Sequence, residues 1–492
     1  MISKKAYYYF SILTILFLGM FVSLVLDEKL YYLTSLVLFL SIIIVLIFFF
    51  VRKNITSTVF LLIGSLITFN IEVSVISTYR EGGLPSSIVI NQYLIYSLIL
   101  LLLSMTCRKK PLVNKLYKYL LFISVMMLLI TFVSSIFSKN YIGAFYQLER
   151  HIFTLILYIS IVSVLSIKNY KYFIYGLSIS IFFQLIISII QNYTGQSLGL
   201  EFLGENPDPF RKGVIDSERG VSGTLGHPGT LGLFLSFSYP ILLTYMIESY
   251  IRKEIKIKNA LFFLVILISI FVLTILTDSR TSMFLTAFST MLVSAFYYIR
   301  FLKKHGLRNS NLFLHYIIVL LIPILFVLFA TIFVINQEDR FLESDFIRQF
   351  HDRMNLNYFS WIIITKSLKN FFIGVGPNNY VDYIGMFGKG EFLYEHPVHN
   401  YYLLIFAENG ILYLILYLLF FIILLKKLVR MILSLKSSYF HIYIGTASSL
   451  FVMLLYNLTG WSFSHNQIYY LIFIQVSIVV RLLIEEDKCI GT

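Results

Sequence analysis

Apolar runs of about 20 residues recur along the whole chain and alternate with shorter polar segments. In helical form, a run of this length crosses the hydrocarbon core of a bilayer. The sequence has none of the alternating segments of about ten residues that predict a transmembrane β-barrel. The pattern therefore predicts an all-α fold, a polytopic bundle of transmembrane helices.

We count about 14 spans, with 12 as the lower bound, and expect each boundary to be correct within about two to four residues. They cover residues 7–26, 31–51, 57–79, 92–107, 117–138, 151–167, 172–190, 225–248, 259–277, 281–299, 313–335, 399–425, 440–458 and 466–485. The first run lacks a small-residue cleavage site, so we expect a retained span rather than a signal peptide.

Lysine and arginine predict the orientation. With the N-terminus in the cytoplasm, 25 of the 39 fall in cytoplasmic segments and 14 fall outside. Because positive residues are retained on the cytoplasmic side, this orientation is preferred over its reverse. An even number of spans also places both termini in the cytoplasm.

Composition excludes several classes of protein. Hydrophobic residues make up 58% of the chain and charged residues 13%, which excludes a soluble multidomain protein. The net charge of +14 fits loops that face anionic lipid, so no nucleic-acid partner is expected. Cys107 and Cys489 lie at opposite ends of the chain, which argues against a structural disulfide and provides no metal–thiolate site.

Nine of the 14 outer positive residues gather in two long outer loops, 191–224 and 336–398. They are Arg211, Lys212 and Arg219 in the first loop and Arg340, Arg348, Arg353, Lys366, Lys369 and Lys389 in the second. Loops of this length without low complexity are usually functional, and positive charge is disfavoured on this side. We therefore expect an anion-binding site on the outer face.

A glycine-rich segment and an arginine in a short turn are candidate parts of this anion-binding site. The segment Asp216-Ser-Glu-Arg-Gly-Val-Ser-Gly-Thr-Leu-Gly-His-Pro-Gly-Thr-Leu-Gly232 lets the main chain approach a phosphate, although a packed small-residue contact between helices explains it equally well. Arg280, in a very short outer turn, has a guanidinium that can bind a diphosphate through two hydrogen bonds. Taken alone, a structural pair with Asp278 explains Arg280 better.

The stretch from His396 to Gly410 begins as a polar loop and becomes apolar at His399. An imidazole is therefore expected at the boundary between water and hydrocarbon, with Glu408 deeper in the span. Ionisable groups at such a boundary indicate a functional site, whereas the alternative for His399 is a role as a helix cap. Glu408 is expected to pair with an arginine or to orient its helix. His396 and His227, each beside a proline, are weaker candidates.

Residues 353–372 carry apolar side chains at helical spacing around Trp361, which predicts a helix that lies in the membrane interface. Gly374-Val-Gly376-Pro then gives a turn signal. The helix is interpreted either as a surface helix anchored by its tryptophan or as a lid over a bound lipid.

Together these segments resemble the O-antigen ligase and O-antigen (capsular) polysaccharide polymerase family of polytopic membrane glycosyltransferases. The resemblance covers residues 200–430 and rests on Arg219-Gly-Val-Ser-Gly-Thr-Leu-Gly-His-Pro, Ser279-Arg280, Arg353, Trp361, Gly374-Val-Gly-Pro and His399-Asn-Tyr-Tyr-Leu with Glu408-Asn-Gly, in the family's order. It implies three regions: N-terminal helices over 1–190, a catalytic region over 191–430, and C-terminal helices with a cytoplasmic tail over 431–492.

The resemblance implies an inverting, metal-independent glycosyltransferase without a cofactor, acting on the outer face of the bacterial cytoplasmic membrane. The donor would be an oligosaccharide linked through diphosphate to a polyprenol, with undecaprenol expected. His399 would be the general base, and Arg219 and Arg280 would hold the diphosphate. The further substrate-binding residues implied are Arg353, Arg211, Asn400 and Glu408. A flippase and a chain-length regulator of the same pathway are the expected protein partners.

Elementary chemistry agrees with these roles. A glycosyl diphosphate already has a good leaving group, so catalysis needs fixed positive charge for that group and a base for the acceptor hydroxyl. A histidine with an ordinary pKa of about 6.5 supplies the base at neutral pH.

Three functions remain open from the sequence. Richness in Ile, Phe, Tyr, Lys and Asn suggests an AT-rich genome, as in many Gram-positive bacteria, and this favours a polymerase of capsule or exopolysaccharide. The second is ligase-type transfer to a lipid or protein acceptor. The third is a transporter of lipid-linked glycan or a small anion, which the absence of a clear internal repeat disfavours.

Overall fold

The protein was analysed as a computed structural model, which describes residues 55–77, 87–106, 114–207, 220–252, 257–305, 343–385, 397–463 and 465–490. In chain order the elements are α3 (Ile55–Ser65), β1 (Glu72–Ser77), β2 (Ser87–Asn91), α4 (Gln92–Thr106), α5 (Lys115–Ile136), α6 (Tyr141–Val164), α7 (Ile167–Thr194), the 3-10 helix η1 (Glu201–Leu203), α8 (Pro228–Ile251), α9 (Ile257–Leu276), α10 (Arg280–His305), α12 (Glu343–Thr365), α13 (Leu368–Ile373), α14 (Tyr380–Ile384), α15 (Tyr401–Leu433), α16 (Phe440–Tyr456) and α17 (Asn466–Ile490).

Among these residues, seven helices are long and apolar enough to cross a membrane: α5, α6, α7, α8, α10, α15 and α17. Shorter apolar helices lie in α3, α4, α9 and α16. The predicted helical, polytopic fold is confirmed. The predicted spans 7–26, 31–51 and 313–335 lie outside the described residues, so the number 14 stays a prediction.

The predicted span 57–79 is wrong in its second half, because α3 ends at Ser65 and β1 begins at Glu72. β1 pairs with β2 in an antiparallel two-stranded sheet, an addition to the predicted all-α fold. The Gln92 side chain donates hydrogen bonds to the carbonyl oxygens of Leu66 and Phe69, at 3.1 and 2.6 Å. These carbonyls would accept main-chain bonds if α3 continued, so a side chain from α4 helps to end the helix.

Close helix contacts depend on small residues, as is usual where lipid provides no hydrophobic drive for association. A Cβ atom at Gly176 of α7 would lie 2.3 Å from the Leu61 carbonyl oxygen of α3. Gly445 of α16 meets α8 in the same way, since its Cβ would lie 3.0 Å from the Pro240 carbonyl oxygen. Backbones at such contacts approach closely only because the side chain is absent.

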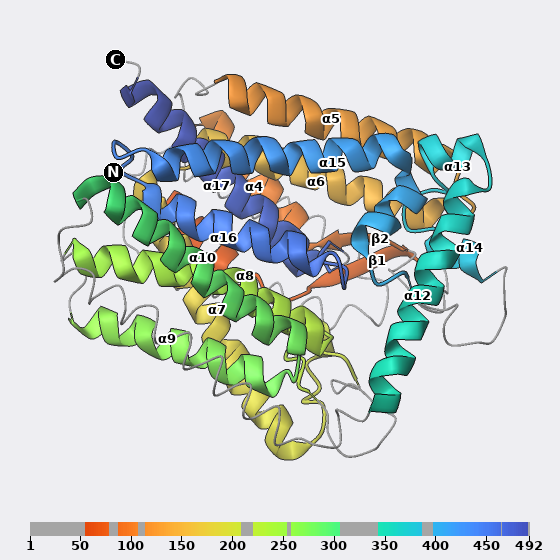
Figure 1. Ribbon diagram of the computed structural model, residues 1–492, viewed down its shortest axis with the longest axis horizontal. Helices are drawn as coiled ribbons and strands as arrows, with labels where there is room; N and C mark the ends of the chain where they lie inside the picture. Colours follow the sequence, from red (N-terminus) through yellow and green to blue (C-terminus); the bar gives the residue numbers. More distant parts are fainter. Residues whose placement is uncertain are drawn as a thin grey trace, which may run out of the picture.

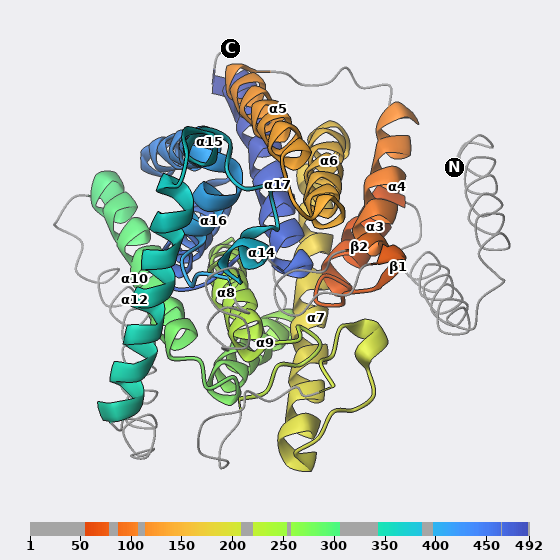
Figure 2. The same cartoon turned by 90° about the vertical axis from the view of Figure 1, so that its right-hand side faces the viewer.

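The long helices other than α7 lie roughly side by side, whereas α7 runs at a steep angle to them (Figure 1); α17 is enclosed in the bundle, with 94% of its apolar window buried. In contrast, α12 crosses the ends of the long helices at a steep angle (Figure 1). Figure 2 views the molecule from this side, with α12 in front. The single helix predicted over residues 353–372 is divided between α12 and α13, and its place in the membrane interface stays a prediction. α12, α13 and α14 all fall within the predicted second long loop.

Candidate functional site

α15 begins next to His399 because Asn400 caps the helix. The Asn400 side-chain oxygen accepts hydrogen bonds from the main-chain N–H groups of Tyr402 and Leu403, at 3.1 and 3.2 Å. An N-cap of this kind satisfies donors that have no partner within the helix. His399 is therefore the residue directly before the N-cap of α15, and its side chain is partly exposed.

The His399 imidazole stacks on the indole of Trp461, with ring centroids 4.6 Å apart and planes inclined by 26°. Trp461 also donates a hydrogen bond from Nε1 to the Val398 carbonyl oxygen at 2.5 Å. Trp461 follows α16 and precedes α17, so the loop between these helices fixes both the main chain before His399 and the plane of its ring.

Asn457, at the end of α16, organises this loop. Its carbonyl oxygen accepts from the Tyr401 N–H at 2.8 Å, and its side-chain oxygen accepts from the N–H and hydroxyl of Ser462. Its amide donates to the Tyr417 hydroxyl at 2.9 Å. Asn457 is fully buried, and its bonds join the end of α16, the start of α15 and the loop that carries Trp461.

The start of α8 lies against the same loop. His227 is the exposed N-cap of α8, and its Nδ1 accepts from the Gly229 N–H at 3.0 Å. The Tyr456 hydroxyl of α16 donates to the Gly229 carbonyl oxygen at 3.4 Å. The glycine-rich segment therefore ends beside the residues that position His399.

Arg280 is the first residue of α10 and is exposed. The start of α10 touches the start of α8, because a Cβ atom at Gly232 would lie 2.1 Å from the Ser282 hydroxyl oxygen. Asp278, just before, has a φ of 50°, the left-handed conformation that lets the turn from α9 to α10 be short. Arg280 and His399 thus lie at one end of the bundle, which we call the His399 end.

The glycine-rich segment also touches the Arg280 turn. The Val221 N–H donates to the Leu276 carbonyl oxygen at 2.9 Å, and a Cβ atom at Gly220 would lie 2.1 Å from the Thr277 carbonyl oxygen. Arg219 immediately precedes Gly220, but Arg219 and Arg211 lie outside the described residues, as does His396.

Four helices, α8, α10, α15 and α17, begin at the His399 end. Each helix start carries partial positive charge from its main-chain N–H groups, which favours an anion. The Arg280 guanidinium adds a full charge to the start of α10. This end of the bundle therefore combines an accessible imidazole with groups that attract negative charge.

Comparison with known proteins shows what part of the chain is similar to. Residues 262–418 match the family described as O-Antigen ligase. This part of the chain is similar to an O-antigen ligase domain. The resemblance seen in the sequence is confirmed, and the domain implies glycosyl transfer at a membrane from a lipid-linked glycan. No curated protein matches the chain.

Within residues 262–418, a kink in α15 contacts the turn around Gly374. Gly410 interrupts α15 with φ 79° and ψ 174°, and the main chain of Phe372 approaches so closely that a Cβ atom at Gly410 would lie 2.2 Å from its carbonyl oxygen. The Ala407 carbonyl oxygen accepts from the Val375 N–H at 2.9 Å. The turn around Gly374 and the Glu408-Asn-Gly sequence are therefore one structural unit.

Glu408 belongs to this unit. Its carboxylate accepts from the Tyr380 N–H at 3.2 Å at the start of α14, and the side chain is buried. The contact with a helix start favours the role of orienting the helix over that of binding substrate. Arg353, by contrast, is exposed on α12, and Asn400 is partly buried as the cap of α15.

Trp461 and Asn457 were not predicted from the sequence, and both lie beyond the matched region. Trp461 is one of only two tryptophans, which was the one available signal. His465, near them in sequence, is a poor base: desolvation, then the charges of His227 and Arg150, lower its pKa to about 3. His465 is therefore not a candidate for the base at neutral pH.

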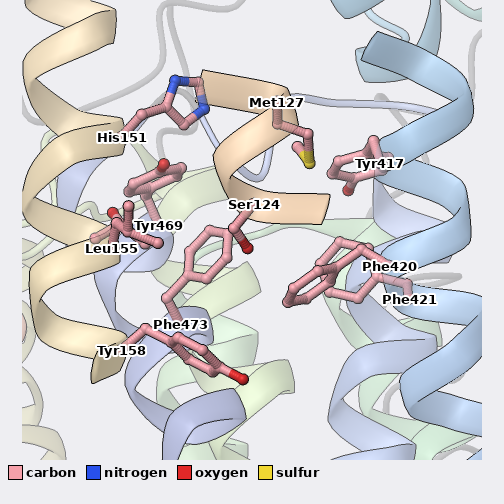
Figure 3. Close-up of a pocket in the computed structure, with 11 residues that line it drawn as sticks. Ser124, Met127, His151, Leu155, Tyr158, Tyr417, Phe420, Phe421, Tyr469 and Phe473 are labelled. Atoms are coloured by element: carbon pink, nitrogen blue, oxygen red, sulfur yellow. The ribbon is translucent and has the colours of Figure 1, made fainter. Parts of the chain in front are cut away.

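A pocket lies further along the bundle, between α5, α6, α15 and α17. It is lined by Ser124, Met127, His151, Thr154, Leu155, Tyr158, Tyr417, Phe420, Phe421, Tyr469 and Phe473. Figure 3 shows His151 and Tyr158 towards opposite ends, with aromatic rings around the space between them. Most of its walls are aromatic, and Tyr417 connects it to Asn457 at the His399 end.

Proposed function

We propose that the protein is an inverting, metal-independent glycosyltransferase that moves a glycan from a polyprenyl diphosphate, undecaprenyl diphosphate in particular, to an acceptor hydroxyl. The observation that carries the proposal is the presence of His399 and Arg280 at one end of a membrane bundle, both within the O-antigen ligase match. We place this end on the outer face of the bacterial cytoplasmic membrane, with both termini in the cytoplasm.

In the proposed reaction, a ring nitrogen of His399 takes the proton of the acceptor hydroxyl. The acceptor oxygen attacks the anomeric carbon, and the bond from that carbon to the diphosphate oxygen breaks. The electron pair leaves with the polyprenyl diphosphate, and the configuration at the anomeric carbon inverts. Fixed positive charge stabilises the leaving diphosphate as its negative charge grows.

We assign that charge to Arg280 and Arg219. Gly220, next to Arg219, lies against the turn before Arg280, which supports a shared site. Arg211, Arg353 and Asn400 are assigned to the glycan or its diphosphate, and Glu408 to the shape of α15.

We favour a polymerase that joins repeat units of capsule or exopolysaccharide, working with a flippase and a chain-length regulator. Transfer of a finished glycan to a lipid or protein acceptor is the second candidate, favoured by the description of the matched family. Both reactions use the same donor chemistry and differ in the acceptor.

The test uses the full chain in lipid nanodiscs with an undecaprenyl diphosphate-linked oligosaccharide. A polymerase converts it to lipid-linked chains of two or more repeats and releases undecaprenyl diphosphate. A ligase leaves single repeats unchanged until the terminal acceptor is supplied. Activity should survive EDTA; loss that a divalent ion restores would contradict the metal-free mechanism, and absence of both products would refute the proposed function.

A further inference from the structure

Arg150 lies within α6 and is 1% exposed. Among the described residues, it is the largest side chain that is fully buried. A guanidinium stays protonated in proteins, so burial keeps a full positive charge away from solvent. Such a charge is retained only when nearby groups compensate for lost hydration. Arg150 lies outside the matched region, and the proposed reaction gives it no role so far.

The contacts of Arg150 reach a distant loop. Its Nη2 donates to the Phe463 carbonyl oxygen at 2.7 Å, and Nη1 donates to Gln147 Oε1 at 2.7 Å on its own helix. The guanidinium carbon lies 4.3 Å from the centre of the Tyr469 ring, at the start of α17. A charged donor makes a stronger hydrogen bond to a carbonyl than a neutral donor does.

The loop held by Arg150 is the one that holds the proposed base. Trp461 stacks on His399 and donates to the main chain at Val398. Tyr401, two residues after His399 in the sequence, stacks on Phe463, with ring centroids 5.2 Å apart. The residues that flank His399 therefore rest on two aromatic rings of one short loop.

We infer that Arg150 is a positioning residue for the proposed glycosyl transfer. It fixes the Phe463 carbonyl, and through the loop it fixes Trp461 and the orientation of the His399 ring. It does not touch the reacting atoms. A general base acts only when its ring nitrogen is within hydrogen-bond reach of the acceptor hydroxyl, so an anchored loop preserves that geometry. This inference rests on the proposed function.

Arg300 provides a matched control. It donates to the carbonyl oxygens of Ile432 and Ser434, at the C-terminal end of α15, and its guanidinium carbon lies 3.8 Å from the Phe440 ring centre. The type of contact is the same, an arginine that holds a loop carbonyl beside an aromatic ring. The loop, however, is at the far end of α15 from His399.

The test has a spectroscopic readout and a kinetic one. With Trp361→Phe as background, Trp461 is the sole tryptophan. Protonation of a stacked imidazole quenches indole emission, so the emission should fall through one acidic step that His399→Ala removes. Arg150→Met should abolish this acidic step in Trp461 emission or shift the pH of its midpoint. It should also lower kcat about 100-fold, with the KM for the lipid-linked donor nearly unchanged.

Arg150→Lys should restore part of kcat, because its ammonium can still donate to the Phe463 carbonyl oxygen. Arg300→Met should lower thermal stability and leave the emission step and kcat at wild-type values. If Arg150→Met does not accumulate, Arg150→Gln takes its place in both measurements. A wild-type emission step and wild-type kcat per folded molecule in either variant would overturn the inference, as would equal effects of Arg150→Met and Arg300→Met.

Failure of the proposed function gives a different pattern. Full transfer activity in His399→Ala would refute His399 as the base. The emission comparison between the Arg150 and Arg300 variants would still decide whether Arg150 orients the His399–Trp461 pair.

Discussion

The polar side chains at the two ends of α15 differ in burial. At the far end, which we call the Glu486 end, the buried Glu486 carboxylate accepts hydrogen bonds from Ser437, Ser438, Tyr439 and Tyr443 at 2.7–3.1 Å. At the His399 end, Arg280 is exposed and His399 is partly exposed on Trp461.

The difference indicates where ligand chemistry can occur. A carboxylate whose oxygens are occupied by one loop stabilises that loop and is buried away from substrate. His399 packs by its ring face on Trp461 and is partly exposed, so this residue is in reach of solvent at its end of the bundle. The Glu486 end is therefore interpreted as structural and the His399 end as functional, and substitutions at the two ends should separate stability from activity.

The largest effect is expected from His399→Ala. Loss of a general base should lower the rate of transfer about 10²–10⁴-fold, while the protein still inserts and folds. The measurement is the formation of glycan product by purified protein of verified thermal stability. Near-normal product length and yield would contradict the assignment of the base.

Arg280→Lys should lower transfer about 10–100-fold. Lysine keeps the positive charge but loses the planar pair of donors that binds a diphosphate through two hydrogen bonds. Arg300→Lys at the Glu486 end is the control and should leave the rate per folded molecule unchanged. Equal, mild effects of both substitutions would indicate that only charge matters at position 280.

Gly410→Ala tests the kink that links α15 to the turn at Gly374. Its positive φ and the close Phe372 carbonyl oxygen predict a loss of about 2–4 kcal/mol in stability. Gly385→Ala is the control, because a Cβ atom there meets the Val381 carbonyl oxygen at an ordinary 3.4 Å. Unfolding in detergent should show a clearly lower Tm for the first variant alone.

Glu486→Gln should cost about 1–3 kcal/mol in stability, because an amide cannot accept all the hydrogen bonds that the carboxylate receives. The rate of transfer per folded molecule should not change. A selective loss of activity at wild-type Tm would contradict the comparison of the two ends.

The smallest effect is expected from His465→Gln. The pKa of His465 is lowered from 6.5 to about 3, so the ring is neutral across the neutral range and the pH profile of transfer should not move. Below pH 6.5 the unfolded chain binds a proton that the folded protein does not, so stability falls as pH drops towards 3. The wild-type Tm should decline over this window, and the variant should decline less.

Much of the fold follows from local pattern. Apolar runs predicted α4, α5, α8, α9 and α16 to within three residues at each end, because hydrocarbon requires every main-chain polar group to bond within its own helix. The same rule failed after Ser65, where Gln92 captures two carbonyls of the preceding chain. A pattern of neighbouring residues does not predict that contact, because it joins residues more than 20 positions apart.

The sequence by itself determined that this is a bundle of long apolar helices, that part of it resembles the O-antigen ligase family, and that a histidine lies just before a long apolar helix. Residue type and spacing are sufficient for that, because they set the cost of placing each group in lipid. Only the tertiary structure decided that Trp461 supports His399, that Glu408 faces Tyr380 and that Arg150 holds Phe463. These are contacts between helices, and they depend on packing that no single segment specifies.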